Sequence, residues 1–450
     1  MNFYLTKTRK FTKKMGIFAF ADNNFSMNYK DLLDWLFVRF PSYQKIGDRA
    51  YKPGLEAMQA FAAELGHPQK HLRMIHVAGT NGKGSVSSML AAALAASGMR
   101  VGLYTSPHLT DFRERMKIIT ADGWEMIPEA DVERFLLQWK DYFEEKQLSF
   151  FEITTGMAFD WFAREAVDAA VIEVGLGGRL DSTNILLPEL SVITNISLEH
   201  CQYLGHTLAE VAGEKAGVIK PGIPVVIGEA LPETRPVFER VAAENESPIL
   251  FAEEAAESFL PVCPEELDLQ GDYQARNLRT VDTALSLAAP VFGLHDLALM
   301  ARGVRRAGAM TGLHGRWETL RAADETRAQL ICDAGHNAHA FRWIRAQLGK
   351  ISCEYEEIVF ILGIVADKDL AAISSYLPRD VHYIFTQPST ARALPVAELA
   401  NLLHESGLNG EVAPTLSDAL ARAESITGPR DLIFVSGSCY LVSDLLALIS

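Results

Sequence analysis

A glycine-rich segment with one lysine and one serine hydroxyl lies between two apolar runs; it reads Gly79-Thr80-Asn81-Gly82-Lys83-Gly84-Ser85. The run before it, 74–77, predicts a buried strand, and the pattern after it, 86–94, predicts a helix. Small residues let backbone N–H groups approach a polyphosphate, Lys83 can reach the outer phosphates, and Ser85 can ligate magnesium. The segment departs from GxxxxGK[ST], because Gly84 separates lysine from hydroxyl. We predict a phosphate-binding loop rather than a tight turn with a surface lysine.

Polar side chains also follow two other apolar runs, at the points where predicted strands end. Glu173 closes the run 169–172, and His200 follows the run 191–196. Because the carboxyl ends of parallel strands meet at one edge of a sheet, both side chains are expected at a ligand-binding crevice, where a carboxylate suits magnesium. Taken alone, Glu173 also fits a helix cap and His200 an ordinary surface or core histidine. By spacing alone, Lys215 is a solvated helix lysine.

Short apolar runs alternate with helical patterns over most of the chain. The first series predicts strands at 74–77, 101–105, 169–174, 191–196, 224–227 and 248–251. A second series, after a turn-rich stretch, predicts strands at 330–332, 358–362, 383–385 and 432–435. Buried strands separated by helices indicate α/β domains with mostly parallel sheets. We expect a first domain at 27–302, a second at 303–450, and a disordered extension at 1–26.

Length and composition narrow the classes of protein further. The chain has 450 residues, 48% of them hydrophobic, which suits two or three globular domains. Its 42 Lys+Arg against 57 Asp+Glu give a net charge of −15, which disfavours nucleic acid and anionic membranes as partners. No apolar stretch approaches the roughly 18 residues of a membrane span. Because the five cysteines form no CxxC pair, we expect a reducing, cytoplasmic location.

The motifs, in their order along the chain, resemble the Mur ligase superfamily and, within it, the folylpolyglutamate and dihydrofolate synthases. The resemblance rests on GTNGKGS at 79–85, SPHL at 106–109, ERM at 114–116, FFEITT at 150–155, EVGLGGRLDSTN at 173–184, EHCQYLGHTLAEVAGEKAG at 199–217, YQARN at 273–277, HGRWE at 314–318, DAGHN at 333–337, DKD at 367–369 and GSCYL at 437–441. It implies an N-terminal P-loop ATPase domain with a parallel sheet and a smaller C-terminal Rossmann-like α/β domain.

The resemblance also implies how ATP and two magnesium ions are held. Lys83 and the amides of 79–85 would bind the β- and γ-phosphates, while Ser85, Glu173 and His200 would gather magnesium. Lys215 matches a lysine that the family carries as a carbamate, a carboxylate-like ligand for a second magnesium. That modification needs a neutral amine, so the pKa of Lys215 must lie well below its usual value of about 10.4.

Three residues from the later part of the chain are expected, by resemblance, to complete the nucleotide site. Asn277 would meet the adenine, Asp333 the ribose and Arg316 the γ-phosphate. The catalytic set implied in this way consists of Lys83, Glu173, His200, Lys215 and Arg316.

The other substrates have their own expected contacts. His336, together with Ser438, would lie on the side of the incoming glutamate. Phe151 and Asp181 match positions that contact the pterin, as a stacking ring and as an acceptor for ring N–H donors. Ser182, beside the second of these, replaces a more common alanine, and Glu199 stands where aspartate often precedes the histidine. The segment 333–336 swaps the usual Gly-Ala order, and none of these differences removes a predicted ligand.

The implied reaction is ATP-dependent amide ligation by a monomer. A carboxylate attacks the γ-phosphate to give an acyl phosphate, and the amine of L-glutamate then displaces phosphate. The acid would be dihydropteroate, a folate or both, and we predict a bifunctional enzyme. Two alternatives stay open. A muramyl ligase of the same superfamily is disfavoured by SPHL and GLGGRLD, and a P-loop nucleotide switch is disfavoured because the chain has no NKxD motif.

Overall fold

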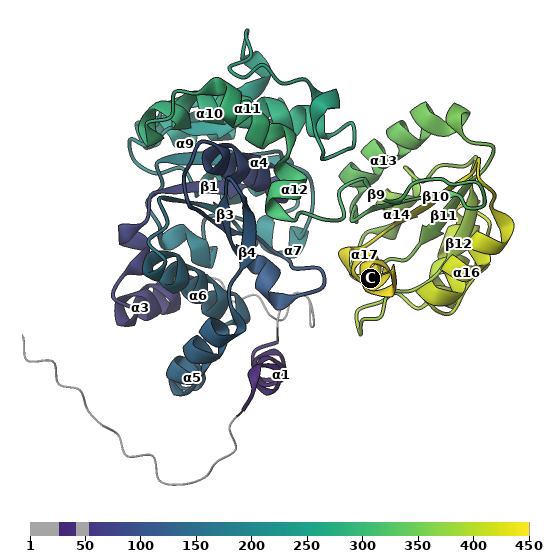
Figure 1. The fold of residues 1–450 in the computed structure, drawn as a ribbon, viewed down its shortest axis with the longest axis horizontal. Coiled ribbons are helices and arrows are strands. Elements are labelled where there is room, and N and C mark those ends of the chain that lie inside the picture. The colour runs from purple at the N-terminus through teal and green to yellow at the C-terminus, as the bar shows by residue number, and fades with distance from the viewer. Residues whose placement is uncertain (1–26, 42–53, 450) are drawn as a thin grey trace, which may run out of the picture.

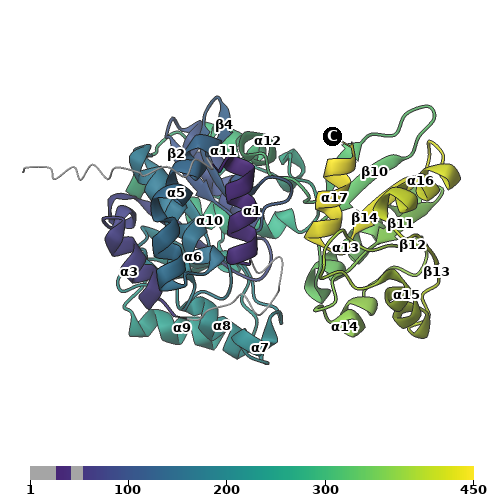
Figure 2. The same ribbon diagram turned by 90° about the horizontal axis from the view of Figure 1, so that it is seen from below.

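The computed structural model describes residues 27–41 and 54–449 and shows two α/β domains side by side (Figure 1). The extension expected at 1–26 lies outside the described residues. The view in Figure 2 separates the same two lobes and places helix α17 on the side of the second domain that faces the first. The predicted class, two α/β domains with mostly parallel sheets, is confirmed.

The first domain is built on an eight-stranded sheet with the order β4-β3-β2-β5-β1-β6-β7-β8. Its strands are β1 Met74–Ala78, β2 Val101–Tyr104, β3 Met116–Thr120, β4 Gly123–Met126, β5 Ala169–Glu173, β6 Leu190–Ile193, β7 Val225–Ile227 and β8 Ile249–Phe251. All six predicted strands are present and pair in parallel. The antiparallel pair β3 and β4 at the edge was not predicted, because the half-exposed β4 has no apolar run.

Helices cover both faces of this sheet. They are α1 Tyr29–Arg39, α3 Glu56–Glu64, α4 Lys83–Ala96, α5 Glu129–Lys146, α6 Phe150–Arg164, α7 Cys201–Leu204, α8 Leu208–Ala216, α9 Arg235–Glu244, α10 Gln274–Phe292, α11 Leu297–Arg305 and α12 Ala307–Thr311. Helix α4 is buried from Ser85 to Ala96, between the sheet and α10 to α12. Its small side chains permit this, and a Cβ at Gly303 of α11 would lie 2.2 Å from the Ala92 carbonyl oxygen.

The second domain is built on a six-stranded sheet with the order β13-β12-β11-β14-β10-β9, in which only β9 is antiparallel. Its strands are β9 Glu318–Arg321, β10 Gln329–Asp333, β11 Ile358–Leu362, β12 His382–Phe385, β13 Gly410–Val412 and β14 Leu432–Ser436. Its helices are α13 Ala338–Ile351, α14 Leu370–Ser374, α15 Val396–Glu405, α16 Leu416–Ile426 and α17 Cys439–Ile449. The four predicted strands form its centre, and the two unpredicted ones are short edge strands.

The packing of the core bears on where the first domain ends. The expected division falls between residues 302 and 303, but Val304, Ala307 and Met310 belong to the same hydrophobic cluster as α4. The chain then turns at Gly312 and Gly315, both at positive φ, before β9 begins. We therefore propose that the boundary lies at about this turn, near residue 312.

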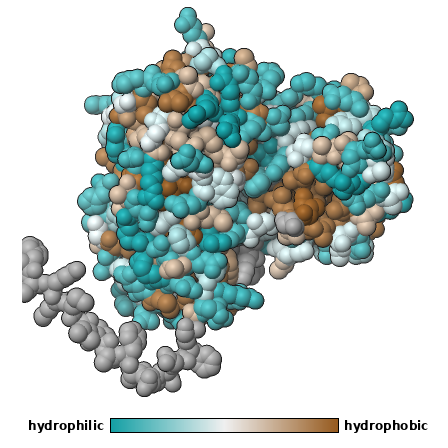
Figure 3. All heavy atoms as spheres, in the orientation of Figure 1, coloured by the Kyte–Doolittle hydropathy of each residue, from teal (hydrophilic) through white to brown (hydrophobic). Residues whose placement is uncertain are grey.

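The surface is mostly hydrophilic on the face shown in Figure 3, with scattered brown spots on the first domain and a more extended brown area over α17 of the second domain. Leu448 and Ile449 at the end of this helix are exposed. Within the described ranges, no helix has the length and apolar character needed to span a membrane.

Candidate active site

The predicted phosphate-binding loop joins β1 to α4 and is held in shape by close packing. A Cβ at Gly79 would lie 1.8 Å from the Thr194 hydroxyl oxygen, and one at Gly82 would lie 2.4 Å from Oδ1 of Asn277. Both glycines also have positive φ, so larger residues would strain the loop. Helix α4 begins directly at Lys83, and its first N–H groups therefore have no partner inside the helix. A loop followed directly by a helix N-terminus is the geometry that binds anions, so the setting expected for a phosphate-binding loop is present, and phosphate binding itself stays a prediction.

Two lysines meet at the base of this loop. Nζ of Lys83 donates hydrogen bonds to the carbonyls of Gly79 and Thr80, each at 3.1 Å. Nζ of Lys215, from α8, donates to the same Gly79 carbonyl at 2.9 Å. Burial, and then the nearby charge of Lys83, lower the pKa of Lys215 to about 7. The spacing alone suggested a solvated helix lysine. The structure instead places Lys215 beside the phosphate loop, where it is buried.

Two side chains with oxygen atoms predicted to bind magnesium are Glu173 and Ser85. Glu173, at the end of β5, accepts a hydrogen bond from the Ser106 backbone N–H at 3.1 Å. Its burial raises its pKa, and the charge of Lys83 opposes that rise. Ser85 is buried in the first turn of α4, where its hydroxyl accepts a hydrogen bond from Gln274 at 3.2 Å. Carboxylate and hydroxyl oxygens are ligands of the kind that magnesium prefers.

His200 starts the short helix α7 in a left-handed conformation, with φ of 54°. Burial lowers its pKa to about 4, against the opposing charge of Glu199, so the neutral imidazole is available as a ligand. Among residues 27–41 and 54–449, no three His, Cys, Asp or Glu side chains are grouped to hold a metal ion. The predicted set contains only Glu173 and His200 of these types, together with Ser85 and a modified Lys215, and it stays a prediction.

A cavity of about 150 Å³ lies over the loop, between the two domains. Most of the predicted nucleotide-binding residues line it: Thr80, Asn81, Gly82, Lys83, Gly84, Asn277, Arg316 and Asp333, with Glu173 beside them. Gly79 and Ser85 lie at the two ends of the same loop. The structure therefore brings most of the residues expected to bind ATP to one cavity, although they come from segments more than 200 positions apart in the sequence, and their contact with ATP stays a prediction.

Two of these side chains also have structural partners. Asp333 ends β10 and accepts hydrogen bonds from the Tyr273 hydroxyl at 2.7 Å and from the Trp317 and Gly335 backbone N–H groups at 2.9 and 2.7 Å. Asn277 donates to Gln274 at 2.8 Å and packs on the phosphate loop. Their predicted contacts with ribose and adenine stay predictions, while their observed contacts tie α10 and the second domain to the loop.

A second cavity, of about 230 Å³, adjoins the first and shares Thr80, Lys83, Ser106, Pro107 and His336 with it. All four residues predicted to bind the acid or glutamate line this cavity, as does His200; the four are Phe151, Asp181, His336 and Ser438. A ligand in this cavity would therefore reach the same Lys83 as a nucleotide in the first.

The wall of the second cavity is tightly built. The Phe151 ring packs on Gly175, where an added Cβ would lie 2.4 Å from the ring. The Asp181 carboxylate accepts from the backbone N–H groups of Gly175 and Leu176 at 3.0 and 2.9 Å, and from the backbone and hydroxyl of Thr183. The Asp181 carboxylate therefore stabilises the loop 175–183, of which it is a part. Its predicted contact with a substrate ring stays a prediction.

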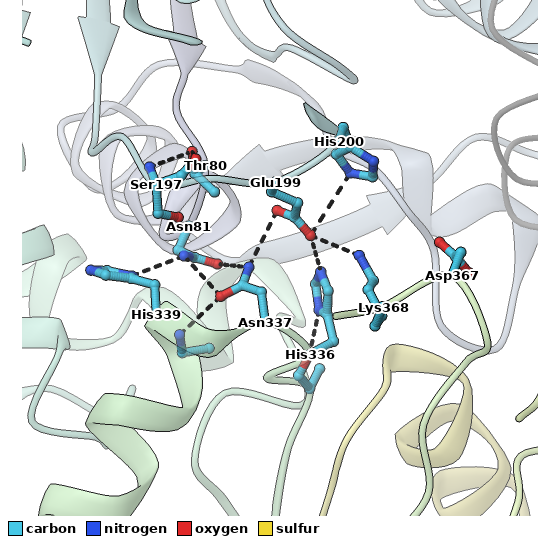
Figure 4. A network of polar contacts seen from close by, with 12 residues as sticks. Thr80, Asn81, Ser197, Glu199, His200, His336, Asn337, His339, Asp367 and Lys368 are labelled. Carbon is cyan, nitrogen blue, oxygen red and sulfur yellow. Dashed lines mark hydrogen bonds and ion pairs between the residues drawn. The ribbon is translucent and has the colours of Figure 1, made fainter. Parts of the chain in front are cut away.

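The structure brings to the site residues that had no predicted role. Lys368, from the loop after β11, and Asn337, before α13, both contact Glu199 of the first domain (Figure 4). Burial alone would raise the pKa of Glu199, but Lys368 and His336 hold it well below its ordinary value. The signals were present, since DKD at 367–369 and DAGHN at 333–337 are among the matching motifs, but only the fold brings them to Glu199.

Comparison with known proteins defines the class. Residues 77–258 match the Mur ligase middle domain, and residues 315–439 match the Mur ligase glutamate ligase domain. The chain is 33% identical to the folylpolyglutamate synthase of Lacticaseibacillus casei over 93% of this chain and 97% of that protein. It is also 33% identical to a probable bifunctional folylpolyglutamate synthase/dihydropteroate synthase of Haloferax volcanii, and it spans about half of that protein's length (48%). The protein belongs to the Mur ligase superfamily.

Solved structures narrow the class to one family. The fold matches Escherichia coli FolC in complex with DHPP and ADP, with a TM-score of 0.79 and 25% identity over 94% of this chain and 98% of that one. It matches a bifunctional folylpolyglutamate synthase/dihydrofolate synthase from Yersinia pestis, complexed with AMPPNP and a Mn ion, with a TM-score of 0.76 and 27% identity over 93% and 98%. The chain belongs to the folylpolyglutamate synthase/dihydrofolate synthase family.

Proposed function

We propose that this protein is a bifunctional dihydrofolate and folylpolyglutamate synthase, which uses ATP to join L-glutamate to dihydropteroate and to folates. The observation that carries the proposal is the pair of adjoining cavities that share Lys83 and His336. One is lined by a phosphate-binding loop and the other by aromatic and polar side chains. Relatives with the same fold bind nucleotide, and one of them binds DHPP as well.

The phosphate side of the site supplies positive charge. Lys83, Arg316 and the N-terminus of α4 lie around the nucleotide cavity, where they would neutralise the charge of the transferring phosphoryl group. In the structure Lys83 donates to loop carbonyls, so binding of ATP would exchange those acceptors for phosphate oxygens. This is how an acidic protein can hold an anionic substrate.

The acid side of the site positions the other reactant. A carboxylate in the second cavity would attack the γ-phosphate and form an acyl phosphate, with ADP as the leaving group. Glutamate's amine would then attack the acyl carbon and release phosphate. A free carboxylate does not react with amines, so this activation is necessary. Residues of the second domain line both cavities, so a bound intermediate would be flanked by protein on that side and less accessible to the water that would hydrolyse it.

The residues fit divalent metal binding in type. Ser85, Glu173 and His200 would hold one magnesium ion, and a carbamate on Lys215 would help to hold a second. Bound magnesium would neutralise phosphate charge and orient the phosphoryl group. Lys215 suits carbamylation, since burial beside Lys83 favours the neutral amine that carbon dioxide requires.

The test is the dependence of ADP release on the acceptors. A ligase releases ADP rapidly only when both an acid and glutamate are present, whereas a nucleotide switch hydrolyses slowly without either. We expect little ADP from MgATP alone and a large increase with dihydropteroate or tetrahydrofolate plus glutamate. Equal rates with and without the acceptors would overturn the proposal. We further propose a monomer in the cytoplasm, which light scattering and cell fractionation can test.

A further inference from the structure

One carboxylate of the first domain contacts three side chains of the second. Glu199 follows β6, and its Oε1 accepts from Nζ of Lys368 at 2.8 Å and from Nε2 of His336 at 3.1 Å. Its Oε2 accepts from Nδ2 of Asn337 at 3.2 Å. Figure 4 shows these donors gathered around the carboxylate. A single side chain thus joins the segment after β6 to two separate loops of the second domain.

This junction is shielded from water. The Glu199 side chain is 11% exposed and that of Lys368 is 12% exposed. An ion pair this enclosed is costly to break, because removing one partner leaves the other charge without compensation. Exposed pairs contribute little by comparison. The chain provides such an exposed pair between the same domains, Lys350 with Asp272 at 3.3 Å, with side chains 69% and 39% exposed.

The junction also adjoins both ligand cavities. His336 and Lys368 line the second cavity together with Glu199 itself. Next to them, Asn337 and Asn81 of the phosphate loop exchange hydrogen bonds at 2.9 and 3.4 Å. Loss of the Glu199 contacts would therefore displace the wall of the second cavity that His336 and Lys368 form. The phosphate loop would be displaced less, because Asn81 is also hydrogen-bonded to Thr194 and Asn195 of the first domain.

We propose that Glu199 is a positioning residue, which docks the second domain through Lys368 and thereby fixes the cavity wall that receives the acid and glutamate. Its length matters. Aspartate would draw the carboxylate back by about one C–C bond, roughly 1.5 Å, and contacts of 2.8 to 3.2 Å would then exceed hydrogen-bond distance. The kinetic part of the test rests on the proposed ligase function, and the structural part does not.

The experiment compares full-length wild type with Glu199→Gln, Glu199→Asp, Lys368→Met and the double variant Glu199→Gln/Lys368→Met. Lys350→Met is the matched control, because it removes the exposed ion pair between the same domains. Small-angle scattering reports the radius of gyration with a non-hydrolysable ATP analogue bound. Steady-state kinetics report KM for glutamate, and a binding assay reports the Kd of the analogue. Thermal unfolding shows that each variant is folded.

We expect Lys368→Met and Glu199→Asp to raise KM for glutamate at least tenfold, to change the Kd of the analogue less than threefold, and to increase the radius of gyration. The double variant should be no worse than the worse single variant, because both remove one interaction. Lys350→Met should match wild type. Additive effects in the double variant, or an unchanged radius of gyration and KM in Lys368→Met, would overturn the proposal. Absence of ligase activity in wild type would instead refute the proposed function, leaving the scattering comparison to decide on Glu199.

Discussion

Lys83 and Lys215 donate hydrogen bonds to the same oxygen, the carbonyl of Gly79, at 3.1 and 2.9 Å. Two ammonium groups on one acceptor repel each other, and burial together with Lys83 brings the pKa of Lys215 to about 7. A carbamate at Lys215 would replace this repulsion with an attraction. The relationship gives a physical reason why this lysine, and not an exposed one, is the expected point of modification.

Lys215→Arg should therefore inactivate the enzyme without unfolding it. Arginine keeps a positive charge but stays protonated and cannot form a carbamate in this role. We expect ADP formation to fall about 100-fold or more, as for loss of a charge-stabilising group in other enzymes. Lys220→Arg is the control, since Lys220 is also partly buried but donates to the Asn184 carbonyl away from the loop. A fully active, folded Lys215→Arg enzyme would contradict the second-magnesium role.

Lys83→Ala should abolish acceptor-dependent ADP formation. The lysine is the charge shared by both cavities, so its loss removes stabilisation from the transferring phosphoryl group, with an expected decrease of about 1,000-fold. Lys70→Ala changes an exposed lysine and should have no effect. Turnover within tenfold of wild type in a folded Lys83→Ala protein would be incompatible with our assignment of the phosphate loop.

Gly175→Ala should weaken binding of the acid and leave ATP binding intact. The added methyl would lie 2.4 Å from the Phe151 ring, so the ring must move out of the cavity wall. We expect KM for dihydropteroate or the folate to rise about tenfold, which corresponds to about 1.4 kcal/mol. The matched control is Gly213→Ala in α8, where a Cβ meets nothing within 4 Å. If Gly175→Ala leaves this KM unchanged, Phe151 does not contact the acid.

Acid should destabilise the fold partly through His76. This histidine is fully buried in β1, its Nε2 lies 2.8 Å from the Thr183 hydroxyl, and burial lowers its pKa to about 3. The unfolded chain takes up the proton below about pH 6.5, whereas the folded chain does not. The free energy of unfolding should therefore fall between pH 6.5 and 3 by up to about 1.4 kcal/mol per pH unit from this group.

The check is the urea midpoint as a function of pH for wild type and His76→Gln. The variant should be less stable at neutral pH, but its stability should fall less steeply over the acid range. His71→Gln, at an exposed position, is the control and should follow wild type. If the urea midpoint depends on pH equally steeply in wild type and in His76→Gln, the buried imidazole does not cause the loss of stability in acid.

Local patterns were sufficient to predict the phosphate loop and the central strands. The loop follows from glycines, a lysine and a hydroxyl between a buried strand and a helix, and β1 and α4 confirm that setting. The buried central strands are mostly apolar, with a single polar residue in several of them, such as His76 in β1, and so they stand out in the sequence. Edge strands such as β4 and β13 are short and half-exposed, so they carry no such pattern.

Contacts between the domains could not be predicted in the same way. Glu199 and Lys368 are far apart in the sequence, and neither lies in a pattern that indicates pairing. Asp181 illustrates a second limit. A resemblance predicts a substrate contact, while the fold shows four donors from the chain itself around its carboxylate. Which groups compete for a polar side chain becomes visible only in three dimensions.

The proposed activity joins glutamate to a pterin acid and consumes ATP. The most direct measurement is mass spectrometry of the products after incubation with MgATP and glutamate, using dihydropteroate in one reaction and tetrahydrofolate in another. We predict that each acid gains one glutamyl residue per ADP formed, with further additions to the folate. ADP without any glutamylated product, or no product from either acid, would contradict the proposed function.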